Sequence, residues 1–163
     1  MLDPCGGVGT IPIVDALVRP GSGLVVDLST ESIELAHNNI RAFGLGDRVF
    51  AEEGDATDLD LADGSVDRVV SDVPFGKKVG SNLANDTLYP RLVAELARVL
   101  AGDGRAVIVT DAELRRQLPA LAKELKRRTA RTIELASLNP AHPDRVVNLG
   151  EVAWMARVMW VRQ

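Results

Sequence analysis

The sequence predicts an α/β domain with a doubly wound, mostly parallel sheet, and two observations lead to this prediction. Short runs rich in Val, Ile and Leu alternate along the chain with longer segments whose apolar residues recur at helical spacing. Such alternation is typical of parallel sheets that helices cover on both faces. The last two predicted strands, at 132–136 and 152–161, have no helix between them, which indicates an antiparallel C-terminal hairpin at the sheet edge.

Composition is that of one soluble domain, which we assign to residues 1–163. Apolar residues make up 46% of the chain and charged residues 26%, and no apolar run approaches the roughly 18 residues of a membrane span. The single cysteine, Cys5, suits a reducing compartment, and we expect a cytoplasmic protein without a membrane association. Because the net charge is −4, any nucleic-acid contact must come from a local basic patch or from another domain.

A glycine-rich loop, residues 3–10, stands at the start of the chain and opens directly into the first predicted helix. Thr10 is the expected N-cap, and Pro12 stands in the first turn, where its missing N–H costs nothing. Arg-Pro-Gly at 19–21 ends this helix. Only two residues precede the loop, so we expect most of the first strand to be absent and the chain to be truncated at its N-terminus.

Strands and helices then alternate through the rest of the chain. The second strand, at 24–26, ends at Asp27, and Ser29 and Thr30 are candidate caps of the helix that follows. The third strand begins at 48–50 and leads toward Asp55, and the fourth, at 66–70, leads to Asp72. The remaining predicted elements are a helix with Leu92, Leu96 and Val99 inward, a turn at 102–104, a strand at 106–109 and a helix lined by Leu114, Leu118, Leu121 and Leu125.

Three features at the carboxyl ends of the predicted strands point to an adenosine-containing cofactor. Gly7 and Gly9 allow the backbone to approach a ligand closely at a helix N-terminus, although the dinucleotide fingerprint G-x-G-x-x-G is absent. Asp27 stands about 20 residues further on, where an acid can accept from ribose hydroxyls. Asp55 could accept from the exocyclic amine of an adenine ring. Together with Asp3 of the first loop, these acids stand at three successive strand ends and are expected to converge at one edge of the sheet.

The segment after the fourth strand, Asp72-Val73-Pro74-Phe75, can hold a planar amine. The Asp72 carboxylate and the Val73 carbonyl can each accept one N–H, because Pro74 restricts the backbone. Phe75 offers an aromatic face on which a flat ring can stack. An amine held by both hydrogens has its lone pair in a fixed direction, which suits transfer of a group to nitrogen.

These motifs resemble those of the class I S-adenosylmethionine-dependent methyltransferases. More narrowly, DPCGGVGTIPI, SDVPFGKKVGSN, LYPRLVAELARVL and GRAVIVT are similar to the THUMP-associated RNA guanine 2-amino methyltransferases. The resemblance implies a Rossmann-like fold and transfer of a methyl group from S-adenosylmethionine to the exocyclic 2-amino group of a guanine in RNA, with transfer RNA as the usual substrate.

The resemblance also implies roles for individual residues. Asp72, Val73, Pro74 and Phe75 would be catalytic, with Phe75 stacking on the guanine, and Lys77 and Lys78 would meet RNA phosphates. No metal site is expected, since His37 lies on the polar face of its predicted helix and His142 in a Pro-flanked loop. Cofactor contacts would come from Asp3, Gly7, Gly9, Thr10, Asp27, Leu28, Asp55, Ala56 and Asp72.

The chain departs from the family pattern in two places. The family loop has a cysteine where this chain has Gly6, and Cys5 stands one position early. The THUMP domain is absent, so we expect the chain to need a further RNA-binding domain or subunit. A small activating partner protein, as in some relatives, is a further expectation.

Two other interpretations stay open at this point. The chain could methylate another planar amine, such as adenine or a glutamine side chain. It could also be a non-catalytic subunit that binds S-adenosylmethionine or a partner without turnover.

Overall fold

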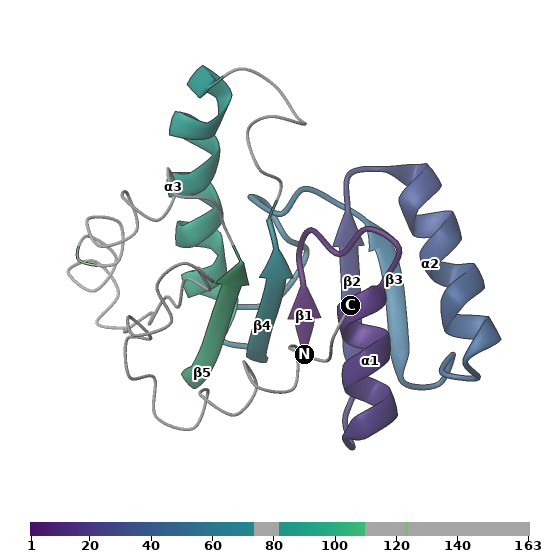
Figure 1. Cartoon of the computed structure of the whole chain (residues 1–163). Helices are drawn as coiled ribbons and strands as arrows, with labels where there is room; N and C mark the ends of the chain where they lie inside the picture. The colour runs from purple at the N-terminus through teal and green to yellow at the C-terminus, as the bar shows by residue number, and fades with distance from the viewer. Residues whose placement is uncertain (74–81, 110–122, 124–163) are drawn as a thin grey trace, which may run out of the picture.

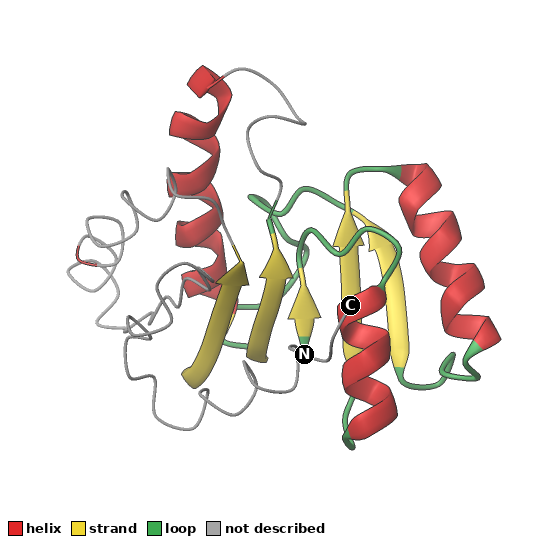
Figure 2. Cartoon of the chain, in the orientation of Figure 1, coloured by secondary structure: helices red, strands yellow, loops and turns green. Residues whose placement is uncertain are grey.

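The computed structural model describes residues 1–73 and 82–109, together with residue 123, as an α/β unit with five parallel strands (Figures 1 and 2). The predicted C-terminal hairpin and the helix expected around Leu114–Leu125 lie outside the described residues. The strand order is β3-β2-β1-β4-β5, and every neighbouring pair is parallel. The elements are β1 (Leu2–Asp3), α1 (Thr10–Val18), β2 (Gly23–Asp27), α2 (Thr30–Ala42), β3 (Val49–Glu53), β4 (Val66–Asp72), α3 (Asn82–Val99) and β5 (Leu100–Val109).

The short strand β1 lies at the centre of this sheet. Leu2 is in register with Leu24 of β2 on one side and with Val69 of β4 on the other. From β1 the chain therefore builds the sheet first toward β3 and later toward β5, so the order reverses beside β1. Ligands of open α/β sheets bind in the crevice beyond the carboxyl ends of the strands at such a reversal. The arrowheads of the strands in Figure 2 point to that edge.

Helices cover the two faces of the sheet, and each face has its own core. Val25 packs with residues of α1 and α2, whereas the next residue, Val26, belongs to the cluster that contains α3. This alternation follows from the two-residue period of a strand. Leu92, Leu96 and Val99 of α3 are buried, as the sequence predicts. In the described part of the chain, no helix has the length and apolar character needed to cross a membrane.

The two N-terminal helices begin in different ways. Ser29 caps α2 as predicted, since its hydroxyl accepts a hydrogen bond from the Ser32 N–H at 3.2 Å. The prediction for α1 is wrong, because Thr10 is the first helical residue and Gly9 is the cap. Gly9 has φ 85°, a left-handed conformation that a threonine adopts only with strain. The glycine loop thus enters α1 through a conformation that needs glycine.

The C-terminal end of α1 is capped by an arginine from a distant segment. Arg48, which directly precedes β3, donates from its guanidinium to the carbonyls of Ala16, Arg19 and Gly21. Carbonyls at the end of a helix lack the N–H donors of a following turn, and a cation is favourable at this negative end of the helix dipole. Arg48 therefore ties α1 to the start of β3, at the amino-terminal edge of the sheet.

Strand β5 begins earlier than the sequence predicts. The turn predicted at 102–104 lies inside β5 as an irregularity, because Val66 pairs with Leu100 whereas Arg68 pairs with Arg105. β5 therefore has three more residues than β4 between these pairs. Gly104 suits the distortion, since a Cβ there would lie 2.9 Å from Leu100 Cδ2 and 3.0 Å from Ala101 backbone atoms.

Candidate functional site

The acids that the sequence places at strand ends come together at the carboxyl edge of the sheet. Asp3 ends β1, Asp27 ends β2 and Asp72 ends β4. Burial raises the pKa of Asp3 most, and the charges of Asp72 and Asp27 raise it further. Cys5 lies in the loop after β1. Burial raises the pKa of its thiol, and the charges of Asp3, Asp27 and Asp55 raise this pKa further. Asp3, Asp27 and Asp55, the three acids expected to converge, therefore lie within electrostatic range of the loop after β1, and Asp72 lies near Asp3.

The glycine loop is fixed by backbone and side-chain hydrogen bonds. The Gly6 N–H donates to the Val26 carbonyl at 2.9 Å, and the Gly9 N–H donates to the Gly6 carbonyl at 2.9 Å. Asn39 of α2 reaches the loop from outside and donates to the Val8 carbonyl at 2.9 Å. The loop therefore has a set shape that is joined to both β2 and α2.

Gly6 occupies a place with no room for a side chain. A Cβ at this position would lie 2.7 Å from Val25 Cγ1 and 3.2 Å from the Asp3 carbonyl oxygen. The neighbouring Cys5 has an intermediate exposure and packs against the core cluster of α3. Burial, together with the charge of Asp3, raises the pKa of the Cys5 thiol to about 12. Cys5 is therefore protonated at neutral pH and is no nucleophile.

Asp27 links three segments through one carboxylate. Its Oδ2 accepts from the Gly7 N–H at 2.9 Å, and its Oδ1 accepts from the Ser29 N–H at 2.9 Å. Its own carbonyl accepts from the Gly54 N–H at 3.0 Å. A carboxylate has about four acceptor positions, so Asp27 keeps acceptor capacity for hydroxyl groups of a ligand. Leu28, the next residue, is 72% exposed and offers apolar surface beside this carboxylate.

Asp55 is held in a tight turn of its own. Its Oδ1 accepts from both the N–H and the hydroxyl of Thr57, each at 2.8 Å. These hydrogen bonds, the backbone bond first, lower the pKa of Asp55, so the side chain is an ionised acceptor. Ala56 has its side chain in the core cluster with α3, which leaves its backbone as the part that can meet a ligand.

Asp3 is a buried acid in the centre of the site. Its residue is 2% exposed, and burial is the main cause that raises its pKa to about 6. The Ser71 hydroxyl and the Cys5 N–H oppose this rise, the latter through a 3.4 Å contact with Asp3 Oδ1. Ser71 itself is fully buried, and its Oγ makes no hydrogen bond of good geometry among the described residues.

Asp72 and Val73 mark the end of β4. The Asp72 residue is exposed, whereas Val73 is 1% exposed and belongs to the core cluster of α3. Burial of Val73 fixes the backbone directly after Asp72. Pro74, Phe75, Lys77 and Lys78, which the sequence analysis assigned to catalysis and substrate binding, lie outside the described residues.

Sequence reasoning missed three residues whose side chains hold the loops of the site in place. Asn39, Glu95 and Arg98 contact the backbone of the site's loops but carry no motif. The i, i+3 spacing of Glu95 and Arg98 indicates an ion pair on a helix and nothing more. In the described part of the chain, no group of three or more His, Cys, Asp or Glu side chains could hold a metal ion.

The chain is similar to known methyltransferases in sequence. Residues 1–139 match the family model described as RMKL-like, methyltransferase domain. The chain is 34% identical over 123 residues to the Bos taurus tRNA (guanine(6)-N(2))-methyltransferase THUMP3, covering 68% of this chain and 24% of that protein. It is 35% identical over 119 residues to the Bos taurus U6 snRNA (guanine-N(2))-methyltransferase THUMPD2, covering 72% of this chain and 23% of that protein. The chain thus spans about a quarter of the length of these relatives.

A solved structure has the same fold. It is a methyltransferase in complex with the Haloferax volcanii Trm112 methyltransferase activator, and the TM-score is 0.51 at 26% sequence identity. The match covers 64% of this chain and 41% of that one. The fold of the described residues is therefore the Rossmann-like fold of methyltransferases.

Proposed function

The chain belongs to the family of RMKL-like methyltransferase domains, and from this premise we propose that it transfers a methyl group from S-adenosylmethionine to the exocyclic 2-amino group of a guanine in RNA. The observation that carries the proposal is the meeting of Asp27, Asp55 and the glycine loop with Asp72 at one edge of the sheet. The named relatives act on guanine N2 in two different RNAs, which supports the base and leaves the RNA to experiment.

The residues at this edge fit an adenosine-containing cofactor. Asp27 has acceptor capacity for the ribose hydroxyls, and exposed Leu28 offers apolar surface for the adenine ring. Asp55 is an ionised acceptor for the adenine amine. Asp3, Gly7, Gly9, Thr10 and the Ala56 backbone complete the proposed set. S-adenosylmethionine, when bound, supplies an electrophilic methyl group on a sulfonium.

The chain's own contribution is to hold and neutralise the target nitrogen. Asp72 would accept one hydrogen of the guanine amine and the Val73 carbonyl the other, with Pro74 restricting the backbone and Phe75 stacking on the base. Alignment of reacting atoms can account for about 7–11 kcal/mol of a barrier. Methyl transfer leaves a positive charge on the nitrogen, which the Asp72 carboxylate stabilises and from which it can accept the proton.

Nucleoside analysis tests the proposal directly. The full chain would be incubated with deuterium-labelled S-adenosylmethionine and transfer RNA or U6 snRNA transcripts, and the digested nucleosides separated by mass spectrometry. Labelled N2-methylguanosine is the expected product. Labelled N6-methyladenosine would show that the substrate is adenine and not guanine. A labelled glutamine side chain in a protein extract would show that the substrate is a protein. Binding of S-adenosylmethionine without any transfer to RNA or protein would favour the non-catalytic interpretation.

RNA recognition is proposed to need more than this chain. Because the net charge is −4, we expect a further RNA-binding domain or subunit to supply most of the phosphate contacts, with Lys77 and Lys78 adding to them. Addition of a THUMP domain in cis or in trans should then raise the rate of methyl transfer. A cytoplasmic location is part of the proposal, on the ground that the only cysteine suits a reducing compartment.

A small activator of the Trm112 type is the second proposed partner, since a structural relative was solved with one. Its proposed docking surface is the outer strand β3 of the described sheet. Phe50 of β3 is 54% exposed, Phe43 is 56% exposed, and a groove between α2 and β3 lies beside Phe50. An outer strand offers backbone groups for pairing, and exposed aromatic residues are typical anchors. Phe50→Asp should abolish co-purification with such an activator, whereas unchanged co-purification would remove β3 as the surface.

A further inference from the structure

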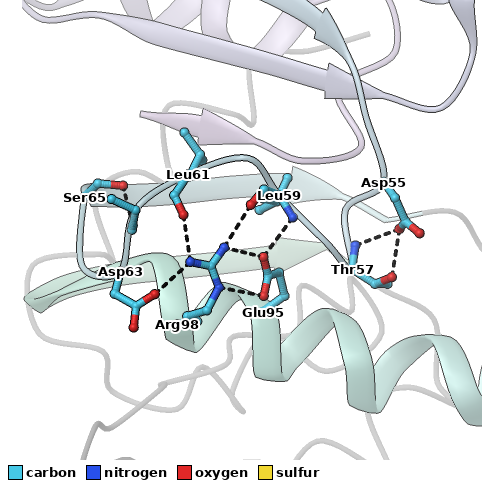
Figure 3. A network of polar contacts seen from close by, with 9 residues as sticks. Asp55, Thr57, Leu59, Leu61, Asp63, Ser65, Glu95 and Arg98 are labelled. Atoms are coloured by element: carbon cyan, nitrogen blue, oxygen red, sulfur yellow. Dashed lines mark hydrogen bonds and ion pairs between the residues drawn. The ribbon is translucent and has the colours of Figure 1, made fainter.

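The connection between β3 and β4, residues 54–65, carries Asp55 and is anchored to α3 by two charged side chains (Figure 3). Glu95 and Arg98 lie one turn apart on α3 and bind each other. Arg98 Nη2 donates to Glu95 Oε1 at 2.6 Å, and Arg98 Nε donates to Glu95 Oε2 at 2.9 Å. This is the two-point geometry in which an arginine and a carboxylate bind most strongly.

Both side chains also hold the backbone of the connection. Glu95 Oε1 accepts from the Leu59 N–H at 2.8 Å, and Arg98 Nη2 donates to the Leu59 carbonyl at 2.9 Å. Arg98 Nη1 donates to the Leu61 carbonyl at 2.7 Å and to Asp63 Oδ1 at 2.8 Å. With the two bonds to Glu95, these contacts use all five N–H groups of a guanidinium. A lysine has three donors at one point and could not reproduce them.

The anchor is partly buried, and both of its side chains are charged. The Glu95 side chain is 12% exposed and that of Arg98 is 33% exposed. The hydrogen bond from Arg98 is the main cause that lowers the pKa of Glu95, and the bond to Glu95 raises the pKa of Arg98. Both groups are therefore ionised across the physiological range. Removal of either would leave a partly buried charge with a lost partner.

Asp55 lies between this anchor and β2. On one side, the Gly54 N–H donates to the Asp27 carbonyl at 3.0 Å. On the other side, the turn of Asp55 closes through the Asp58 N–H, which donates to the Asp55 carbonyl at 2.9 Å. Leu59, which both Glu95 and Arg98 hold, follows directly. The turn that carries Asp55 is therefore followed directly by a backbone segment that residues about 40 positions away hold in place.

We propose that Glu95 and Arg98 are positioning residues that set how well this site recognises the exocyclic amine of adenine. The inference rests on the proposed function, in which Asp55 accepts from that amine. A hydrogen bond weakens steeply as its angle and distance leave their optimum. A displaced turn would therefore weaken the bond from the adenine amine to Asp55, while the ribose contacts at Asp27 would change less.

Calorimetry with two ligands tests this role. S-adenosylhomocysteine has the exocyclic amine, and S-inosylhomocysteine has a carbonyl oxygen there, which Asp55 would repel. The chain should prefer the adenosine compound by at least about tenfold, and Arg98→Met should reduce this preference by about tenfold. Arg48→Met is the matched control, because Arg48 also donates to several backbone carbonyls but lies at the opposite edge of the sheet. It should leave the preference unchanged.

Two further measurements keep the outcome decisive. Glu95→Gln retains an oxygen that can accept from Leu59 and should show a smaller loss of preference, so it decides the question if Arg98→Met does not fold. In an Asp55→Ala background, Arg98→Met should have no further effect on the preference. An unchanged preference in both the Arg98 and Glu95 variants would overturn the positioning role. If the wild-type chain binds neither compound, the proposed function itself fails, and the two failures are thereby distinguished.

Discussion

Gly7 and Asp27, which are 20 positions apart in the sequence, are joined by a 2.9 Å hydrogen bond from the Gly7 N–H to Asp27 Oδ2. Because Ser29 donates to the other oxygen of the same carboxylate, the glycine loop, the end of β2 and the cap of α2 share one anion. The proposed cofactor site is thus preorganised around Asp27 before any ligand binds.

Asp27→Ala should weaken binding of S-adenosylhomocysteine by at least about tenfold, since the ligand hydroxyls lose a charged acceptor and the loop loses its anchor. Isothermal calorimetry measures this directly. Asp67→Ala is the control, because Asp67 is an exposed acid near the amino-terminal end of β4. Equal affinity in the wild type and the Asp27 variant would remove Asp27 from the site.

Asp72→Ala should lower the rate of methyl transfer by about 10²-fold while affinity for S-adenosylhomocysteine changes little. Loss of the side-chain oxygen leaves the target amine without one of its two acceptors. Asp72→Asn keeps an oxygen and should retain measurable activity, followed by labelled-methyl incorporation into RNA. An Asn variant as inactive as Ala would assign the carboxylate a role as base or counter-charge. Full activity in both variants would contradict the substrate role of Asp72.

The raised pKa of Asp3 should make its own contribution to the stability of the ligand-free chain fall as the pH rises. Its pKa is about 6 in the folded chain against 3.8 as the ordinary value, so between these values the folded state binds more protons than the unfolded state. The contribution of Asp3 to the free energy of unfolding therefore falls from pH 4 to pH 7, by up to about 3 kcal/mol, and is constant above that range.

Asp3→Asn removes this titration, so denaturant unfolding of both proteins at pH 4 and pH 7 measures it. The variant should gain stability relative to the wild type as the pH rises. A difference between the two proteins that stays constant over this range would show that Asp3 does not titrate near pH 6.

Gly6→Ala should lower the free energy of unfolding by about 1–3 kcal/mol, because its Cβ would meet Val25 Cγ1 at 2.7 Å. Gly46→Ala is the matched control, since no atom lies within 4 Å of a Cβ there, and its effect should stay within about 0.5 kcal/mol. Thermal and denaturant unfolding compare the two. Equal stability of both variants would mean that the loop relaxes around a side chain at position 6.

Features with a local cause were predictable from the sequence. The hydroxyl cap at Ser29 and the ends of β2 at Asp27 and β4 at Asp72 follow from residue type and apolar run length. Class of fold follows from the alternation of strands and helices, and the family comparison confirms it.

Features that depend on distant contacts were not predictable in the same way. Thr10 looks like a cap, but Gly9 takes that position with a left-handed backbone, where a Cβ would lie 3.4 Å from Val25 Cγ2 of β2. Gly102 and Gly104 indicate a turn, whereas pairing with β4 extends β5 through them. Glu95 and Arg98 acquire their role from Leu59, which is 36 and 39 positions away. The catalytic assignments to Pro74 and Phe75 remain predictions.

Arg48 has a consequence for how the chain opens. Its guanidinium joins the last carbonyls of α1 to the start of β3, so these two segments cannot separate from one another without breaking several hydrogen bonds at once. Amide protons at the C-terminal end of α1 and at the start of β3 should therefore exchange with solvent as one cooperative unit. Fraying, which is usual at the end of a nine-residue helix, is coupled here to the opening of an outer strand.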